Sequence, residues 1–204
     1  MLIRKIIPII ADFLVPFVFF RKYRILKRNI RSLWLKKMWR YCGENVYVGK
    51  IGTIAGSQYI SIADNTRLGD YIYITAWDCV NNVHYSPSIA IGKNCCFGAF
   101  NHITCINQIY IGDACLTGKW VTITDNNHGD MISSELIIAP EKRTMSTKGA
   151  VVIGNNVWIG DKATILSGVK IGNGVIVAAN SVVTKDIPDN CIVGGNPVRI
   201  LKQL

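Results

Sequence analysis

The stretch VVIGNNVWIGDKATILSGVKIGNGVIVAANSVV, from Val151 to Val183, repeats with a period of six residues. Every sixth residue is a β-branched aliphatic: Ile153, Ile159, Ile165, Ile171, Val177 and Val183. This period fits neither the 3.6-residue turn of a helix nor a free-standing hairpin, whereas short strands joined by tight turns produce it. Stacked units of this kind bury a continuous aliphatic column. The stretch therefore predicts a β-solenoid rather than an irregular β-sandwich.

A weaker form of the same rhythm extends toward the N-terminus. Two earlier sets keep the six-residue step and differ by a slip of two: Ile91, Phe97, Ile103 and Ile109, then Ile111, Thr117 and Ile123. Two more sets precede them: Val48, Ile54 and Ile60, then Ile62, Leu68 and Ile74. The solenoid is therefore predicted to cover residues 43–204, as one all-β domain.

Three motifs resemble those of the hexapeptide-repeat acyltransferases: NNVWIG (155–160), VTKDIP (183–188) and GGNPVR (194–199). More narrowly, they are similar to the galactoside and maltose O-acetyltransferases and to exopolysaccharide acetyltransferases. The resemblance implies a left-handed parallel β-helix with roughly three hexads per coil. It also implies a homotrimer with active sites between subunits and transfer of an acetyl group from acetyl-CoA to a sugar hydroxyl.

The rhythm stops at TITDNNH, residues 122–128, and resumes after a loop predicted at residues 129–149. Acyl transfer needs a base that takes the hydroxyl proton, and histidine titrates near neutral pH. The resemblance places the catalytic histidine before such an excursion, so His128 is the predicted general base. The expected substrate contacts are Asn101, Asn107 and Asp125. His102 and His84 are expected to be structural, substrate-contact or loop residues.

The donor site is predicted from the resemblance. The expected coenzyme A site contains a large side chain, a backbone contact to the cofactor and small side chains beside the pantetheine arm. It also contains cations for the phosphates. The corresponding residues are Trp158, Gly160, Asp161, Ala179, Thr184, Lys185 and Arg199.

The net charge is concentrated at the N-terminus. Residues 1–50 carry twelve Lys and Arg against Asp12 and Glu44, a net charge of +10, whereas residues 51–204 carry eleven of each sign. Residues 6–20 are apolar but too short, at about 15 residues, to span a bilayer. Residues 21–41 are predicted to form a helix with Ile25, Leu26, Ile30, Leu33, Trp34 and Met38 on one face. Residues 1–42 are read either as a segment on an anionic membrane or as a cap on the solenoid.

Other functions are less consistent with these patterns. The seven cysteines are odd in number and lack CxxC spacing, which indicates reduced thiols rather than disulfides or zinc. The three histidines are too dispersed for a zinc hydro-lyase on this kind of solenoid, and no nucleic-acid motif is present, so neither a metal nor a nucleic-acid partner is expected. The remaining alternative is a non-catalytic solenoid scaffold. The expected location is cytoplasmic, either free or peripheral on the inner face of a bacterial membrane.

Overall fold

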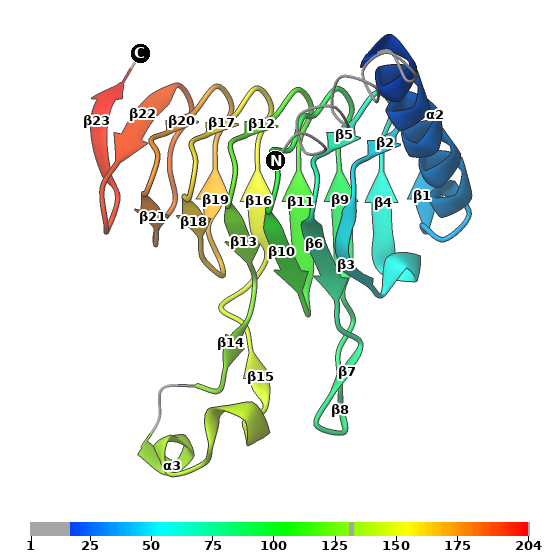
Figure 1. The fold of residues 1–204 in the computed structure, drawn as a ribbon. Helices are drawn as coiled ribbons and strands as arrows, with labels where there is room; N and C mark the ends of the chain where they lie inside the picture. Colours follow the sequence, from blue (N-terminus) through cyan, green and yellow to red (C-terminus); the bar gives the residue numbers. More distant parts are fainter. Residues whose placement is uncertain (1–16, 131–132, 204) are drawn as a thin grey trace, which may run out of the picture.

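The computed structural model describes residues 17–130 and 133–203 and shows a parallel β-helix (Figure 1). The chain turns through three strand positions per coil, and strands of successive coils pair in parallel into three faces, here named A, B and C in chain order. The apolar stretch before Phe17 lies outside the described residues.

Faces A and C each contain six strands. Face A consists of β1 (Tyr41–Cys42), β4 (Ile60–Ile62), β9 (Ser88–Ile91), β11 (Gln108–Ile111), β16 (Val151–Ile153) and β19 (Lys170–Ile171). Face C consists of β3 (Ile51–Ala55), β6 (Ile72–Ala76), β10 (His102–Cys105), β13 (Thr122–Thr124), β18 (Thr164–Ile165) and β21 (Val182–Val183).

Face B holds the remaining solenoid strands. They are β2 (Tyr47–Val48), β5 (Arg67–Leu68), β12 (Leu116–Thr117), β17 (Trp158–Ile159), β20 (Ile176–Val177), β22 (Cys191–Gly194) and β23 (Arg199–Gln203). Bridges from Arg67 to Cys96 and from Cys96 to Leu116 connect its two halves. The last strand, β23, reverses and pairs antiparallel with β22.

The repeat predicts the core correctly. All six aliphatic residues of the Ile153–Val183 grid are buried, with at most 2% of their surface exposed. The earlier sets point inward as well, and Ile54 alone among them is only partly buried. The slip of two between Ile109 and Ile111 has a simple cause, because both are inward positions of the same strand, β11.

The corners between faces need residues with positive φ. At the A–B corner this column is mostly asparagine, which tolerates the left-handed region: Asn45, Asn65, Asn94, Ala114, Asn156, Gly174 and Asn190. At the B–C corner three successive coils instead place Tyr71, Phe100 and Trp120 there. Their rings stack, with centroids 5.2 Å apart for Tyr71 and Phe100 and 4.2 Å apart for Phe100 and Trp120. Stacking offsets the backbone strain of bulky residues at these positions.

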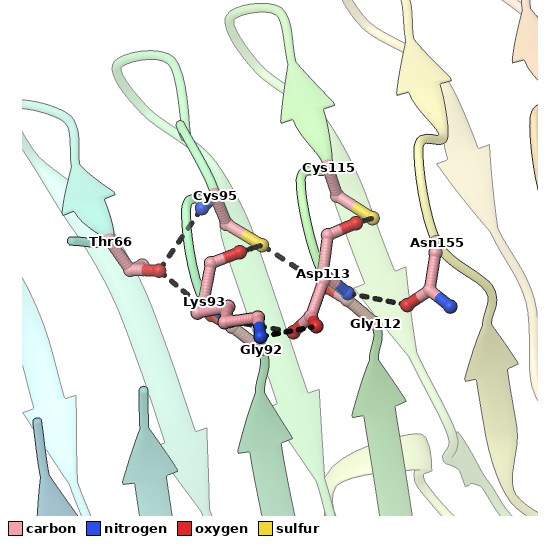
Figure 2. A network of polar contacts seen from close by, with 8 residues as sticks. All are labelled: Thr66, Gly92, Lys93, Cys95, Gly112, Asp113, Cys115 and Asn155. Atoms are coloured by element: carbon pink, nitrogen blue, oxygen red, sulfur yellow. Dashed lines mark hydrogen bonds and ion pairs between the residues drawn. The ribbon is translucent and has the colours of Figure 1, made fainter. Parts of the chain in front are cut away.

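Buried thiols satisfy backbone groups beside the A–B corner (Figure 2). The Cys95 Sγ donates to the Gly112 carbonyl of the next coil at 3.1 Å. One coil earlier, the Thr66 hydroxyl donates in the same way to the Gly92 carbonyl at 2.8 Å. Cys115 repeats the pattern toward Gly154 at 3.1 Å. These cysteines therefore replace hydroxyl donors within the coil stack.

Two projections leave the solenoid at the C–A corner (Figure 1). The first, after β6, is a hairpin of β7 (Cys79–Val80) and β8 (Val83–His84). The second, after β13, contains β14 (Asn127–His128), α3 (Ser133–Leu136), η2 (Pro140–Lys142) and β15 (Met145–Ser146). We name them the small arm (77–87) and the large arm (126–150). The large arm matches the predicted loop 129–149, although its stem begins at β14.

The N-terminal helix α2 (Phe17–Lys36) packs on β2 at the end of the solenoid, and a short turn, η1 (Ser57–Tyr59), precedes β4. The predicted helix is confirmed as far as Lys36, but it ends there instead of at residue 41, so Met38 lies beyond it. Within the described residues, no helix is long and apolar enough to cross a membrane.

Candidate active site at the C–A corner

His128 lies on β14, at the stem of the large arm and just beyond the end of face C. Its side chain is exposed, and its direct partner across the antiparallel pair β14–β15 is Met145. The histidine therefore stands where the solenoid opens into the arm, on paired backbone rather than in a free loop.

Asp125 fixes the chain just before this stem. Its side chain is fully buried, and its carboxylate accepts hydrogen bonds from the Ile106 and Asn107 amides, both at 2.9 Å. The Cys105 thiol and the Asn126 side chain donate to the same carboxylate, each at 3.1 Å. Asp125 thus anchors the exit of the large arm to the C–A corner of the preceding coil.

The following coil holds the same stem from the other side. The Ser167 hydroxyl donates to the Asp125 carbonyl at 2.7 Å and accepts from the Lys148 amide at 2.8 Å. One buried hydroxyl therefore contacts both the chain that leaves for the arm and the chain that returns from it. A second tie is made within the stem, where the Ser146 hydroxyl donates to the Gly129 carbonyl at 2.9 Å.

The two arms are bonded to each other. The Tyr85 hydroxyl, which follows β8, accepts from the Met145 amide at 2.9 Å and donates to the Met145 carbonyl at 3.1 Å. The Asn81 side chain donates to the Glu141 and Arg143 carbonyls at 2.9 and 3.1 Å. Together the arms form an arch. It lies beside the C–A corner after β10, which carries Ile106 and Asn107 and separates the bases of the two arms.

Neither Tyr85 nor the small arm is anticipated by the sequence analysis. The dipeptide Asn81-Asn82 is a hairpin signal between Cys79-Val80 and Val83-His84, and both asparagines have positive φ, at 51° and 63°. The role of Tyr85 leaves no comparable signal, because its partner is backbone 60 residues away.

Burial and charge control the thiol beneath this corner. Burial raises the pKa of the Cys105 thiol well above its usual range, and the adjacent Asp125 carboxylate raises it further. The thiol therefore stays protonated at neutral pH and serves as a hydrogen-bond donor.

The predicted substrate contacts occupy different surroundings. Asn107 is exposed beside the arch, and its amide binds Asp125. Asn101 is buried at the B–C end of β10: its side chain donates to the Thr117 hydroxyl and accepts from the Val121 amide at 2.8 Å. Asp125 is equally enclosed. Asn101 and Asp125 are thus buried and hydrogen-bonded inside the chain, whereas Asn107 is exposed. Substrate contact by these three residues stays a prediction.

The predicted donor residues fall into two groups within one chain. Thr184 and Lys185 are exposed after β21, at the C–A corner that also carries His128. The other group lies on face B and the B–C corner and contains Trp158, Gly160, Asp161, Ala179 and Arg199. Ala179 and Lys185 are six residues apart on either side of β21, which places roughly 15–20 Å between the groups.

Backbone contacts organise the B–C group. The Asp161 carboxylate accepts from the Lys119 amide at 2.9 Å, and a Cβ on Gly160 would meet the Ala179 nitrogen at 2.5 Å. Gly160 is therefore required for close coil stacking. Arg199 is the cross-strand partner of Gly194, and a Cβ on Gly194 would lie 3.2 Å from the Ala178 Cβ. The terminal strand therefore places a cationic residue beside the small residues of this corner.

Among the described residues, neither Lys185 nor Arg199 forms an ion pair with a carboxylate. Within residues 17–130 and 133–203, Lys93 and Asp113 form the one ion pair, at 3.8 Å. Asp186, next to Lys185, instead accepts from the Lys170 amide at 2.8 Å. Two exposed cations without anionic partners are suited to phosphate groups.

The other histidines stand apart from this stem. His102 lies on the outer side of β10, with its ring edge-on to Tyr73 at 6.3 Å, and burial lowers its pKa. His84 is exposed on β8. Among the described residues, no three His, Cys, Asp or Glu side chains gather as metal ligands do.

Comparison with known proteins agrees with this architecture. Residues 150–185 match the family model described as bacterial transferase hexapeptide (six repeats). A putative lipopolysaccharide biosynthesis O-acetyl transferase of Escherichia coli K12 is 33% identical over 97% of this chain and 87% of its own length. The galactoside O-acetyltransferase of the same organism is 35% identical over 59% of this chain and 56% of its own length.

A solved structure shares the fold over most of the chain. A point mutant of AntD, an N-acyltransferase from Bacillus cereus solved in complex with dTDP and coenzyme A, is 25% identical to this chain. The two superpose with a TM-score of 0.67, covering 84% of this chain and 88% of that one.

Proposed function

Because the chain belongs to the hexapeptide-repeat acetyltransferases, we propose that it moves the acetyl group of acetyl-CoA to a sugar hydroxyl with His128 as the general base. The observation that carries the proposal is the position of His128. It is an exposed histidine on a stem that hydrogen bonds of Asp125 and Ser167 hold to the preceding and following coils, beside the arch formed by the two arms. The relative named for lipopolysaccharide biosynthesis supports a surface-polysaccharide or lipid-linked glycan precursor as acceptor.

The proposed reaction is direct transfer. His128 accepts the proton of the acceptor hydroxyl as its oxygen attacks the thioester carbonyl. A C–O bond forms, the tetrahedral intermediate collapses, the C–S bond breaks, and the proton passes from the imidazolium to the leaving thiolate. The arms position the acceptor, and Asn107 is the predicted substrate contact that the structure leaves accessible there.

The donor residues support a site made by more than one copy. One chain holds His128, Thr184 and Lys185 at the C–A corner and the remaining donor residues at the B–C corner. In the homotrimer we propose, the C–A corner of one copy lies beside the B–C corner of the next. Trp158, Gly160, Asp161 and Ala179 then flank the cofactor arm, while Lys185 and Arg199 bind its phosphates.

We divide the chain into an N-terminal segment, residues 1–42, and the catalytic solenoid, residues 43–204. The exposed basic helix in the first of these supports attachment at the inner face of a bacterial membrane. Such a location would bring the enzyme to a lipid-linked acceptor.

The test uses the full-length protein, acetyl-CoA and a panel of free, nucleotide-linked and lipid-linked sugars, with acetylated product detected by mass spectrometry. His128→Ala is expected to lower kcat/KM by about 10²–10⁴-fold. His84→Ala, on the other arm, is the matched control and should act as wild type. Retention of activity by His128→Ala within a few fold would refute the general-base role.

Coenzyme A binding is tested separately by calorimetric titration. Lys185→Ala and Arg199→Ala should each weaken binding by roughly fivefold to fiftyfold, as loss of a charge-assisted contact does. Lys170→Ala, an exposed lysine on face A, should leave affinity unchanged. Equal affinity in all three variants would remove Lys185 and Arg199 from the donor site.

A further inference from the structure

Helix α2 exposes the side that an amphipathic helix usually buries. Its most exposed large apolar residues recur at intervals of three and four, with 57–69% of each side chain exposed: Phe19, Tyr23, Leu26, Ile30, Leu33 and Trp34. At 100° per residue these positions form one continuous stripe along the helix. Ile25 is also exposed but lies outside the stripe. A patch of this extent on a soluble domain marks an interaction surface.

The opposite side of α2 holds the helix on the solenoid. Leu35 and Trp39, just past the helix, are buried in the core. The Ser32 hydroxyl accepts from the Val48 amide at 3.0 Å, and the Arg31 guanidinium donates to the Gly49 carbonyl. The helix is thus docked through a mixed polar face, and its apolar stripe is directed away from the protein. The side that caps the solenoid and the exposed apolar stripe are therefore two faces of the same helix.

The charge of α2 restricts what can cover the stripe. The sequence of α2, FVFFRKYRILKRNIRSLWLK, contains seven Lys and Arg and no Asp or Glu. Lys22 and Lys27 lie on the two flanks of the stripe, and the Lys27 ammonium sits 5.9 Å from the Tyr23 ring centre. An apolar stripe bordered by cations is complementary to a partner surface with an apolar interior and an anionic outer layer.

We propose that the α2 stripe docks on an anionic lipid surface, with the helix lying in the plane of the headgroups. A second copy of α2 is a poorer occupant, because two helices with only positive charges repel each other and offer no pairing acids. Residues 1–16 are a poorer occupant as well, since they add Arg4 and Lys5 against Asp12 alone. The docking surface is independent of the chemistry at His128.

Vesicle co-sedimentation of the full-length protein tests the surface. Vesicles of phosphatidylcholine alone are compared with vesicles that also contain phosphatidylglycerol. The stripe variant carries Leu26→Gln, Ile30→Gln and Leu33→Gln, which keep net charge and helix propensity. Its matched control carries Leu136→Gln and Ile137→Gln, at the exposed apolar tip of the large arm.

Wild type and control should partition onto the phosphatidylglycerol vesicles, and the stripe variant should bind at least about tenfold more weakly. Lys22→Gln and Lys27→Gln should each lower binding by about fivefold, as one cation near an anionic surface does. Raising salt from about 0.1 M to about 1 M shortens the Debye length from about 10 Å to about 3 Å and should weaken wild-type binding.

Tryptophan quenching by brominated lipid places the contact. Trp34→Phe should remove the vesicle-dependent quenching, and Trp158→Phe should retain it. Equal partitioning of the stripe variant and wild type would overturn the proposal, as would no binding by wild type. So would a stripe variant whose only change, without vesicles, is a smaller oligomer, which would identify a second copy as the occupant. Trp34 shielded from both acrylamide and lipid would identify residues 1–16 as the cover.

Discussion

The Tyr85 hydroxyl binds both backbone groups of Met145, accepting from its amide and donating to its carbonyl. Met145 is the cross-strand partner of His128, and its own amide and carbonyl face the small arm instead of β14. A residue on one arm therefore fixes the strand that supports the proposed base on the other.

Removing this hydroxyl should affect catalysis more than folding. In Tyr85→Phe the ring remains, but both hydrogen bonds to Met145 are lost. We expect kcat to fall about fivefold to fiftyfold with little change in Tm, because the rate of proton transfer depends steeply on the position of the general base. Steady-state kinetics and thermal melts measure both. Tyr110→Phe, an exposed tyrosine on face A, is the control. A fall in Tm that accounts for the whole loss would make Tyr85 merely structural.

Replacing the buried carboxylate should destabilise the corner. Asp125→Asn substitutes an NH₂ group for one oxygen that faces hydrogen-bond donors. We expect a loss of about 2–4 kcal/mol in the free energy of unfolding, as an unpaired buried group costs. Asp113→Asn retains its exposed acceptor to the Lys93 amide and should cost under about 1 kcal/mol. Urea unfolding of both variants decides, and equal losses would contradict the anchoring role.

Two positive-φ positions should respond in opposite directions to asparagine. Ala114 has φ 56° without any ring contact, so Ala114→Asn should stabilise the protein by about 0.5–1 kcal/mol. Phe100 stacks on both Tyr71 and Trp120, so Phe100→Asn relieves strain but loses two ring contacts. We expect it to destabilise by about 1–2 kcal/mol. Chemical denaturation measures both. Stabilisation by Phe100→Asn would show that strain outweighs stacking.

His102 should make the fold sensitive to mild acid. Burial lowers its pKa below the unfolded value of 6.5, so the unfolded chain binds a proton more readily than the folded chain. The stability it contributes is present above pH 6.5 and is lost as pH falls through the lower folded pKa. His102→Gln should therefore lose less Tm than wild type between neutral and mildly acid pH. An identical Tm decline in the two proteins would contradict this linkage.

The sequence predicts those parts of the fold that repeat. The aliphatic grid from Ile153 to Val183 fixes which side chains point inward, because each coil imposes the same spacing on the next. The position of His128 at a break in this grid is equally visible. The grid does not reveal the small arm, because a hairpin between Trp77 and Pro87 simply adds residues between two coils.

The contacts between distant segments are the part that sequence could not provide. Asn101 and Asp125 are polar residues near the break, and the sequence does not reveal that they hydrogen-bond to Val121 and Asn107 of neighbouring coils. Tyr85 meets Met145 only because both arms leave the same corner. Helix α2 was foreseeable from its periodicity, whereas the outward direction of its stripe depends on how Ser32 and Arg31 dock.

The arms leave the solenoid two coils apart, after β6 and β13, with one uninterrupted C–A corner between them after β10. His102 and Thr122 are register partners, so one coil here contains 20 residues and advances the solenoid by one strand spacing of about 4.8 Å. The distance between the arm bases is therefore about 10 Å and changes only in whole coils. A single inserted residue disturbs a corner, whereas an inserted coil moves the two arm bases apart by a fixed step. The size of acceptor that fits between the arms is thus set by a count of coils.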